Sequence, residues 1–204
     1  MKVGLIVEGH GEVYAVPILM RRIVQELAPA LHPTILTPHR VSRGQLVKEE
    51  ELERALGLMA RKVGEDGRIL ILLDADDDLP CVLGPRLLEQ ARKCRPDRDI
   101  SVVVAKREYE AWFLASAESL RGRRGLPEEL APPPSPENIR DAKGWLSERM
   151  VDGYRETLDQ PALTGIFNLT AARRSDSFDK LFREVGRLFG LPIPPRPSAN
   201  SVPG

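Results

Sequence analysis

Three short runs of apolar residues predict strands that are buried on both faces. They lie at 2–7, 69–73 and 100–105, and polar or charged residues follow each of them. A weaker run, rich in β-branched residues, lies at 33–37. Continuous apolar runs of this length are typical of parallel sheets, because helices cover both faces of such sheets.

Apolar residues recur at helical spacing in the segments between and after these runs. The spacing predicts helices at 12–27, 48–63, 83–93, 108–120, 137–150 and 177–188. This alternation predicts an α/β fold with an open, mainly parallel sheet, helices on both faces and a C-terminal helical extension.

The composition of the chain changes after residue 120, where a basic segment and then a proline-rich segment follow. We therefore expect a core at 1–120, and a linker with a helical extension packed on that core at 121–190. A proline-rich tail at 191–204 is expected to be extended or disordered.

Composition and charge limit the kinds of partner and the cellular location that we expect for this protein. Hydrophobic residues make up 42% of the chain and charged residues 29%, with 30 basic residues balancing 30 acidic ones. This balance argues against a general polyanion-binding surface but leaves room for a local basic patch. The two cysteines form no disulfide framework, and no signal peptide or bilayer-spanning apolar run is visible. We expect a cytoplasmic protein with no membrane partner.

Acidic residues gather directly after two of the buried runs. Glu8 and Glu12 follow the first run, with glycines between them, and Asp74, Asp76 and Asp78 follow the second. Carboxyl ends of parallel strands meet at one edge of the sheet, where open α/β sheets bind ligands. So many carboxylates repel one another unless a cation lies among them, and hard oxygen ligands suit Mg²⁺ or Mn²⁺. Alternate aspartates of an extended chain would point the same way and share one ion.

A third motif, Arg107-Glu108-Tyr109-Glu110-Ala111-Trp112-Phe113, follows the third apolar run. Glu8-Gly9 and Asp74-Ala75-Asp76 resemble the two motifs of the Toprim domains of topoisomerases, primases and overcoming-lysogenization-defect nucleases. With the third motif, the chain resembles a Toprim-like family that is labelled only as a domain of unknown function, of the 4276 type. The resemblance covers most of residues 1–190.

The resemblance implies a Mg²⁺- or Mn²⁺-dependent enzyme that acts on nucleic-acid phosphodiesters, in the first instance a nuclease. It implies metal ligands at Asp74, Asp76, Asp78 and Glu110, and catalytic roles for Glu8, Glu12 and Lys180, the last within a Ser-x-x-Lys pattern. Candidates to hold the nucleic-acid backbone, DNA in preference to RNA, are Arg40, Arg43, Arg107 and Arg123.

The resemblance also implies a context and leaves alternatives open. Small Toprim proteins often accompany a separate ATPase of the ABC or AAA kind, and some such pairs defend bacteria against phage. One alternative is a non-catalytic partner that binds metal and nucleotide and regulates such an ATPase. Another is a phosphotransfer enzyme for small molecules, because such enzymes also place aspartates at strand ends. A homodimer is left open.

Several of these residues also have purely structural interpretations. Glu12 and Glu110 lie near predicted helix starts, where acidic residues are favoured in any protein. We assign Trp112 to the core and Lys143 to the packing of a later helix.

Overall fold

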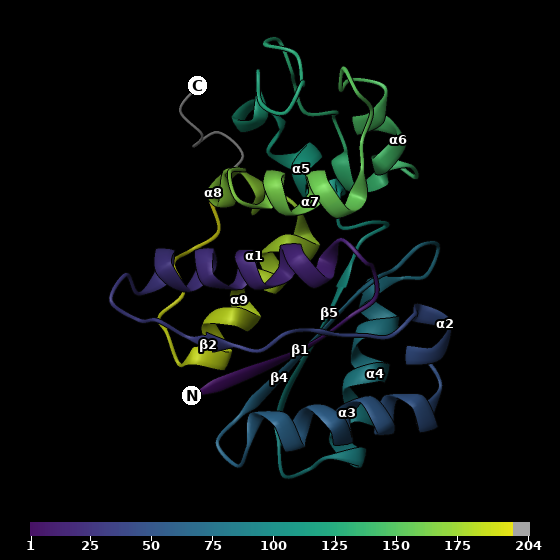
Figure 1. Cartoon of the computed structure of the whole chain (residues 1–204), viewed down its shortest axis with the longest axis vertical. Helices are drawn as coiled ribbons and strands as arrows, with labels where there is room; N and C mark the ends of the chain where they lie inside the picture. Colours follow the sequence, from purple (N-terminus) through teal and green to yellow (C-terminus); the bar gives the residue numbers. More distant parts are fainter. Residues whose placement is uncertain (198–204) are drawn as a thin grey trace.

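The computed structural model describes residues 1–197 and contains one five-stranded parallel sheet (Figure 1). Its strands are β1 (Lys2–Val7), β2 (Thr34–Ile35), β3 (His39–Arg40), β4 (Arg68–Asp74) and β5 (Asp99–Ala105). The strand order is β2-β1-β4-β5, and β3 pairs with β1 beyond the end of β2. The expected α/β fold with an open parallel sheet is thus confirmed.

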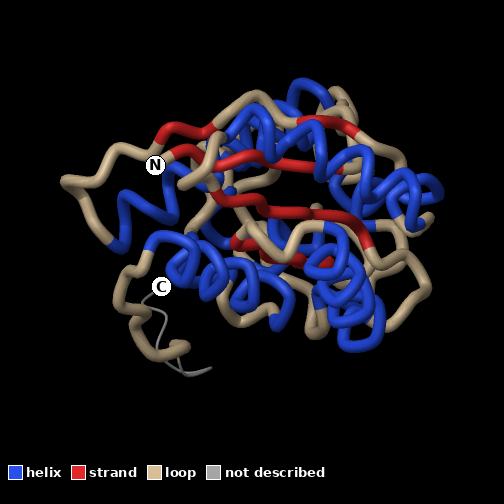
Figure 2. Tube along the Cα trace, turned by 90° about the horizontal axis from the view of Figure 1, so that it is seen from below, coloured by secondary structure: helices blue, strands red, loops and turns tan. Residues whose placement is uncertain are grey.

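Helices cover both faces of the sheet (Figures 1 and 2). On one face lie α1 (Glu12–Leu27) and α9 (Asp176–Phe189), and on the other lie α3 (Glu49–Val63) and α4 (Pro80–Cys94). The short helix α2 (Arg43–Leu46) precedes α3.

The apolar strands alternate between two cores, which explains their continuous hydrophobicity. Leu5 and Leu70 face the core formed with α1 and α9, whereas Ile6 and Ile71 face the core formed with α3 and α4. All four side chains are fully buried. Burial of this kind contributes about 1.5–3 kcal/mol for each large aliphatic side chain.

The chain reverses its direction of travel across the sheet between β1 and β4. It leaves β1 through α1 toward β2 on one side, and it returns through α3 to β4 on the other side. In open α/β sheets, ligands bind at such a switch point, outside the carboxyl ends of the strands.

The segment after β5 forms a layer that packs over α1 (Figure 1). It comprises α5 (Ala111–Ala115), a 3₁₀ turn at Ala117–Leu120, a 3₁₀ turn at Pro136–Asn138, α6 (Ala142–Ser147), α7 (Glu156–Thr164) and α8 (Leu169–Ala172). Buried aromatic side chains join this layer to α9, with ring centroids 5.3 Å apart for Trp112 and Phe178. The assignment of Trp112 to the core is therefore confirmed.

The structure corrects several predicted elements. The predicted helix at 108–120 is broken into α5 and a 3₁₀ turn, and the one at 137–150 shrinks to α6. The weak strand predicted at 33–37 is reduced to β2 at 34–35, and the unpredicted strand β3 follows at 39–40. Neither α7 nor α8 was predicted. The helices at 12–27, 48–63, 83–93 and 177–188 are confirmed as α1, α3, α4 and α9, to within three residues at each end.

The beginning of the proline-rich tail is tied to the body of the protein. Arg173 donates hydrogen bonds to the carbonyl oxygens of Pro194, at 3.0 Å, and Pro195, at 3.2 Å. Residues 191–197 form neither helix nor strand, but this part of the tail is bound to the body of the protein. Residues 198–204 lie outside the described residues. Among residues 1–197, no helix combines the length and apolar character that crossing a bilayer requires.

Candidate functional site at the carboxyl edge of the sheet

Two acidic residues meet at the switch point of the sheet. Glu8 directly follows β1 and Asp74 ends β4, and these two strands are neighbours. The backbone N–H of Asp74 donates to Glu8 Oε2 over 3.3 Å. Asp74 Oδ1 accepts from the backbone N–H of Tyr109 over 2.9 Å, which ties the end of β4 to the segment after β5.

Glu12 points back from the first turn of α1 toward the same edge. Its Oε2 accepts hydrogen bonds from the backbone N–H groups of Glu8, at 2.9 Å, and Gly9, at 3.0 Å. The turn between them needs glycine at position 11, because a Cβ there would lie 2.8 Å from the carbonyl oxygen of Glu156. The side chain of Glu12 is 2% exposed, so its charge has little access to water.

Glu110 is fully buried at the start of α5 and only half satisfied. Its Oε1 accepts from the Tyr154 hydroxyl, at 2.8 Å, and from Gln160 Nε2, at 3.0 Å. Its Oε2 has no hydrogen-bond partner among the described residues. Because a buried polar atom without a partner costs about 1–3 kcal/mol, this oxygen favours a bound proton or cation.

Lys143 brings a positive charge to these carboxylates from α6. Its Nζ lies 3.6 Å from Glu156 Oε2, and Glu156 Oε1 accepts from the backbone N–H of Gly11 at 3.0 Å. The backbone N–H of Lys143 also donates to Glu108 Oε2 at 3.2 Å. Lys143 therefore does more than pack its helix, which corrects the prediction from sequence.

Apart from Glu108 and Glu110, these charged side chains line one cavity of about 250 Å³. Its lining includes Glu8, Glu12, Asp74, Lys143, Glu156 and Gln160. Arg40, His10 and Ser42 lie at the same cavity, with Arg40 donating to the backbone oxygen of Glu8.

The buried carboxylates hold protons more tightly than free carboxyl groups do. Burial raises the pKa of Glu12 to about 7, and hydrogen bonds from two backbone N–H groups offset this only in part. Burial also raises the pKa of Glu110 to about 7, although the charge of Lys143 opposes the shift. Burial, then the charges of Glu12 and Glu110, raise the pKa of Asp74 well above its ordinary value.

The negative charges of the same carboxylates also raise the pKa of Lys143. Burial alone would lower the pKa of this ammonium group, but the carboxylates of Glu110, Asp74 and Glu156 outweigh burial and raise it. Lys143 is therefore charged over the whole physiological pH range and partly balances the acidic cluster.

These shifts predict that the metal-free protein loses stability as the pH rises. A carboxyl group whose pKa is raised on folding stabilises the protein fully below its unfolded value, here 4.5. That contribution is lost as the pH rises through the folded pKa of about 7. In Glu110→Gln, the decrease in the free energy of unfolding between low and high pH should be smaller by on the order of 3 kcal/mol, at about 1.4 kcal/mol per pKa unit.

Urea unfolding in EDTA between pH 4.5 and pH 8 tests this expectation. Glu148→Gln is the matched control, because the Glu148 side chain is 77% exposed. An unchanged pH dependence in Glu110→Gln would contradict the assignment of Glu110 as a group that titrates with folding.

The acidic residues after Asp74 are placed differently from the prediction. Asp76 has a φ of 49° and begins a turn, so the chain is not extended here and the aspartates do not alternate on one face. Asp76 and Asp78 are exposed and both pair with Arg43, while Asp77 pairs with Arg107.

The turn at 76–78 is held against the segment after β5. Arg107 has a φ of 67°, and its Nη1 donates to the carbonyl oxygen of Asp76 over 2.9 Å. The N–H of Asp76 in turn donates to the carbonyl oxygen of Arg107 over 3.1 Å. Arg43 also donates to the carbonyl oxygens of Asp74 and Ala75, each over 3.2 Å. Two arginines expected to hold a nucleic acid thus lie beside the cavity and are paired with this acidic turn.

Two predicted site residues are not brought to this edge. Lys180 lies on α9 and pairs with Glu184, which accepts from Ser101 near the amino end of β5 over 2.7 Å. Arg123 is exposed in the turn that follows Leu120, and it does not line the cavity.

The donor set fits a divalent cation in its chemistry, although the ligands are not gathered. Across residues 1–197, no three Asp, Glu, His or Cys side chains are placed to hold one metal ion together. Mg²⁺ typically takes one or two protein carboxylates and completes its shell with water and substrate oxygens. Asp74 and Glu8 could supply such a pair, and the unpartnered Oε2 of Glu110 is a further oxygen donor.

Sequence patterns missed four residues of the site, namely Lys143, Tyr154, Glu156 and Gln160. All come from the layer after β5, where the apolar spacing predicted α6 only as part of a longer helix and did not predict α7. The only local signal is that Glu156 and Gln160 lie four residues apart on α7, so their side chains share one face of the helix.

Fold and site together define an α/β protein with a buried acidic centre at the switch point of a parallel sheet. A family model described as a domain of unknown function (DUF4276) matches residues 7–186. The chain belongs to this family. Neither a search of curated proteins nor a search of solved structures returned a match.

Proposed function

We propose that this protein is a Mg²⁺- or Mn²⁺-dependent enzyme that cleaves nucleic-acid phosphodiesters. One observation carries the proposal: the carboxylates of Glu8, Asp74 and Glu110, from three separate segments, interact electrostatically with the charged Lys143 at the carboxyl edge of the sheet. The first two acidic motifs, Glu8-Gly9 and then Asp74-Ala75-Asp76, resemble those of Toprim domains in kind and order, which supports the same reaction class.

The residues of the cavity divide into complementary roles in this proposal. Asp74 and Glu8 would hold the cation, which would polarise the phosphoryl group and activate a water molecule. Burial raises the pKa of Glu8, although the hydrogen bond from Asp74 opposes the shift, so Glu8 can also take up a proton from the attacking water. Lys143 would balance the charge of the phosphoryl oxygens, a role that the sequence pattern gave to Lys180.

The geometry also supports a binding role for the arginines of this edge. Arg40 lines the cavity, and Arg43 and Arg107 lie beside it. Because backbone phosphates could replace the aspartates of the turn at 76–78 as partners of Arg43 and Arg107, we include these arginines in the proposed substrate site.

Cleavage of labelled single-stranded DNA, double-stranded DNA and RNA with Mg²⁺ or Mn²⁺ tests the proposal. We expect products that depend on the metal and disappear in EDTA, with DNA preferred to RNA. Products that persist in EDTA would contradict a metal-dependent reaction.

A second candidate is a non-catalytic partner of a separate ATPase. The observation that favours it is the ion pair of Lys143 with Glu156. Through this pair the ammonium group of Lys143 already places a positive charge beside the acidic centre, so the centre does not require a metal ion for charge balance. On this proposal, a partner ATPase of the ABC or AAA kind, as in phage-defence pairs, would gather the ligands. Absence of cleavage by the purified protein, together with calorimetric binding of Mn²⁺ that Asp74→Asn removes, would favour this candidate.

A further inference from the structure

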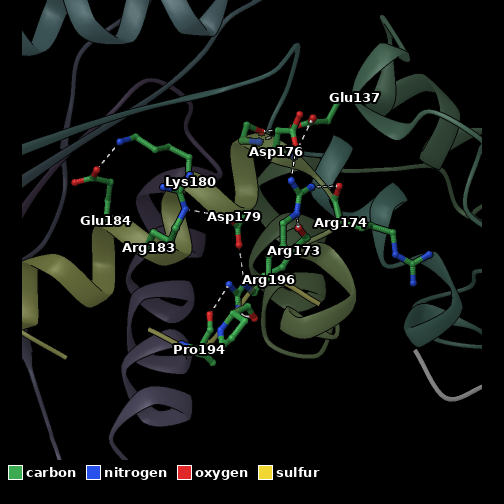
Figure 3. A network of polar contacts seen from close by, with 12 residues as sticks. Glu137, Arg173, Arg174, Asp176, Asp179, Lys180, Arg183, Glu184, Pro194 and Arg196 are labelled. Atoms are coloured by element: carbon green, nitrogen blue, oxygen red, sulfur yellow. Dashed lines mark hydrogen bonds and ion pairs between the residues drawn. The ribbon is translucent and has the colours of Figure 1, made fainter. Parts of the chain in front are cut away.

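A second polar cavity, of about 220 Å³, lies outside the acidic centre. Its wall is formed by Lys106 after β5, by residues 134–138 and by Arg174 and Ser175 before α9. Figure 3 shows the Arg174 side chain extending away from the network of ion pairs around α9, whereas Glu137 lies beside Asp176 within that network. Two cations from distant parts of the chain, Lys106 and Arg174, thus share one cavity.

The positive charges in this cavity are less compensated than the acidic charge beside them. Lys106 forms no ion pair within the described part of the chain, and Arg174 is paired only with Glu118, over 3.3 Å. Glu137, by contrast, accepts from the backbone N–H groups of Asp176, at 3.1 Å, and Ser177, at 2.9 Å. The positive end of α9 therefore balances the carboxylate of Glu137.

Neighbouring residues connect this cavity to the acidic centre. Lys106 is adjacent in the chain to Arg107, which lines a cavity of about 200 Å³ together with Arg140 and the carboxylates of Asp76, Asp77 and Glu108. Glu108 in turn holds the backbone N–H of Lys143, which lines the acidic cavity. Polar cavities that contain both acidic and basic side chains therefore follow one another from the proposed reaction centre, past the end of β5, to Arg174.

We infer that the cavity at Lys106 and Arg174 is a phosphate-binding subsite for the backbone of a nucleic-acid strand whose scissile phosphate lies at the acidic centre. The inference rests on the proposed function and deepens it, because it assigns a second contact with the substrate strand outside the reaction centre. Asn138 and Ser135 at the same cavity supply neutral hydrogen-bonding groups suited to phosphate oxygens.

Binding of a labelled single-stranded oligonucleotide to the full chain in EDTA tests the subsite without requiring cleavage. Affinity is measured by fluorescence anisotropy over a series of salt concentrations. Each lost phosphate contact lowers the slope of log K against log salt by about 0.7 for single strands. The double variant Lys106→Ala, Arg174→Ala should therefore lower the slope by about 1.4 and weaken binding at low salt.

A matched control removes two positive charges on the opposite face of the sheet. Arg54→Ala, Lys93→Ala changes the net charge equally, and both side chains are exposed on α3 and α4. The single variant Arg174→Lys keeps the positive charge and leaves Lys106 unchanged, so it should retain most of the wild-type slope. Three results would overturn the subsite. The slope could be unchanged in the double variant, it could fall equally in the control, or the wild-type protein could bind no oligonucleotide.

The two proposals fail in different ways. Metal-dependent cleavage with an unchanged slope would remove the subsite and leave the enzyme. A slope that falls as expected, in a protein that cleaves nothing, would leave the subsite and remove the proposed reaction.

Discussion

Asp74→Asn is expected to lower the rate of metal-dependent cleavage by at least about 10²-fold, while the protein remains folded. Asp74 stands at the end of β4 and shares the cavity with Glu8, Glu12 and Lys143. The asparagine keeps an oxygen that can accept from the N–H of Tyr109, so the local structure should survive. What is lost is the negative charge that would hold the cation.

The same substitution is expected to stabilise the metal-free protein above neutral pH. Burial and the charges of Glu12 and Glu110 raise the pKa of Asp74, so its ionised form is disfavoured in the folded state. Removing that charge relieves the repulsion, and a gain in stability with a loss of activity is the expected signature of a functional residue.

Cleavage rates and urea unfolding at pH 8, measured on the same preparations, check both expectations. Asp66→Asn is the matched control, because Asp66 is exposed and precedes the opposite end of the same strand. Retention of wild-type cleavage by Asp74→Asn would show that the acidic centre is not the reaction site. Loss of both stability and activity would point to a structural role for Asp74 instead.

The sheet and part of the acidic site were predictable because local patterns encode them. Continuous apolar runs place β1, β4 and β5, and parallel strands bring their carboxyl ends together. The positions of Glu8 and Asp74 follow directly from the ends of these strands. Glu12 and Glu110 are brought to the same site, although their sequence positions alone fit ordinary helix starts equally well.

The remainder of the site depends on contacts between distant segments. Lys143 lies on α6, whose start is held by Glu108, which accepts from the backbone N–H groups of Ala142 and Lys143. The turn at 76–78 departs from an extended chain because Arg43 and Arg107 hold its carbonyl oxygens and carboxylates. No periodicity in the sequence reports such contacts.

Arg173→Ala is expected to lower the free energy of unfolding by about 3–5 kcal/mol, the largest effect on stability that we predict. Arg173 Nε pairs with Asp179 Oδ1 at 2.8 Å, and the two side chains are only 4% and 7% exposed (Figure 3). The guanidinium also lies 4.4 Å from the ring centroid of Phe182 and holds the carbonyl oxygens of two tail prolines. The substitution therefore leaves a buried carboxylate with one fewer partner and frees the start of the tail.

Arg183→Ala provides a control that shares the same carboxylate. Arg183 Nε lies 2.9 Å from Asp179 Oδ2, but its side chain is 52% exposed, so its loss should cost only about 0–1 kcal/mol. In thermal unfolding, Arg173→Ala should lower the midpoint by about 6–20 °C, at about 2–4 °C per kcal/mol for a chain of this size. Equal effects of the two variants would mean that burial does not determine the strength of this ion pair. A large loss confined to Arg173→Ala would show that the ion pair between Arg173 and Asp179 anchors α9 and the tail to the layer that carries Lys143.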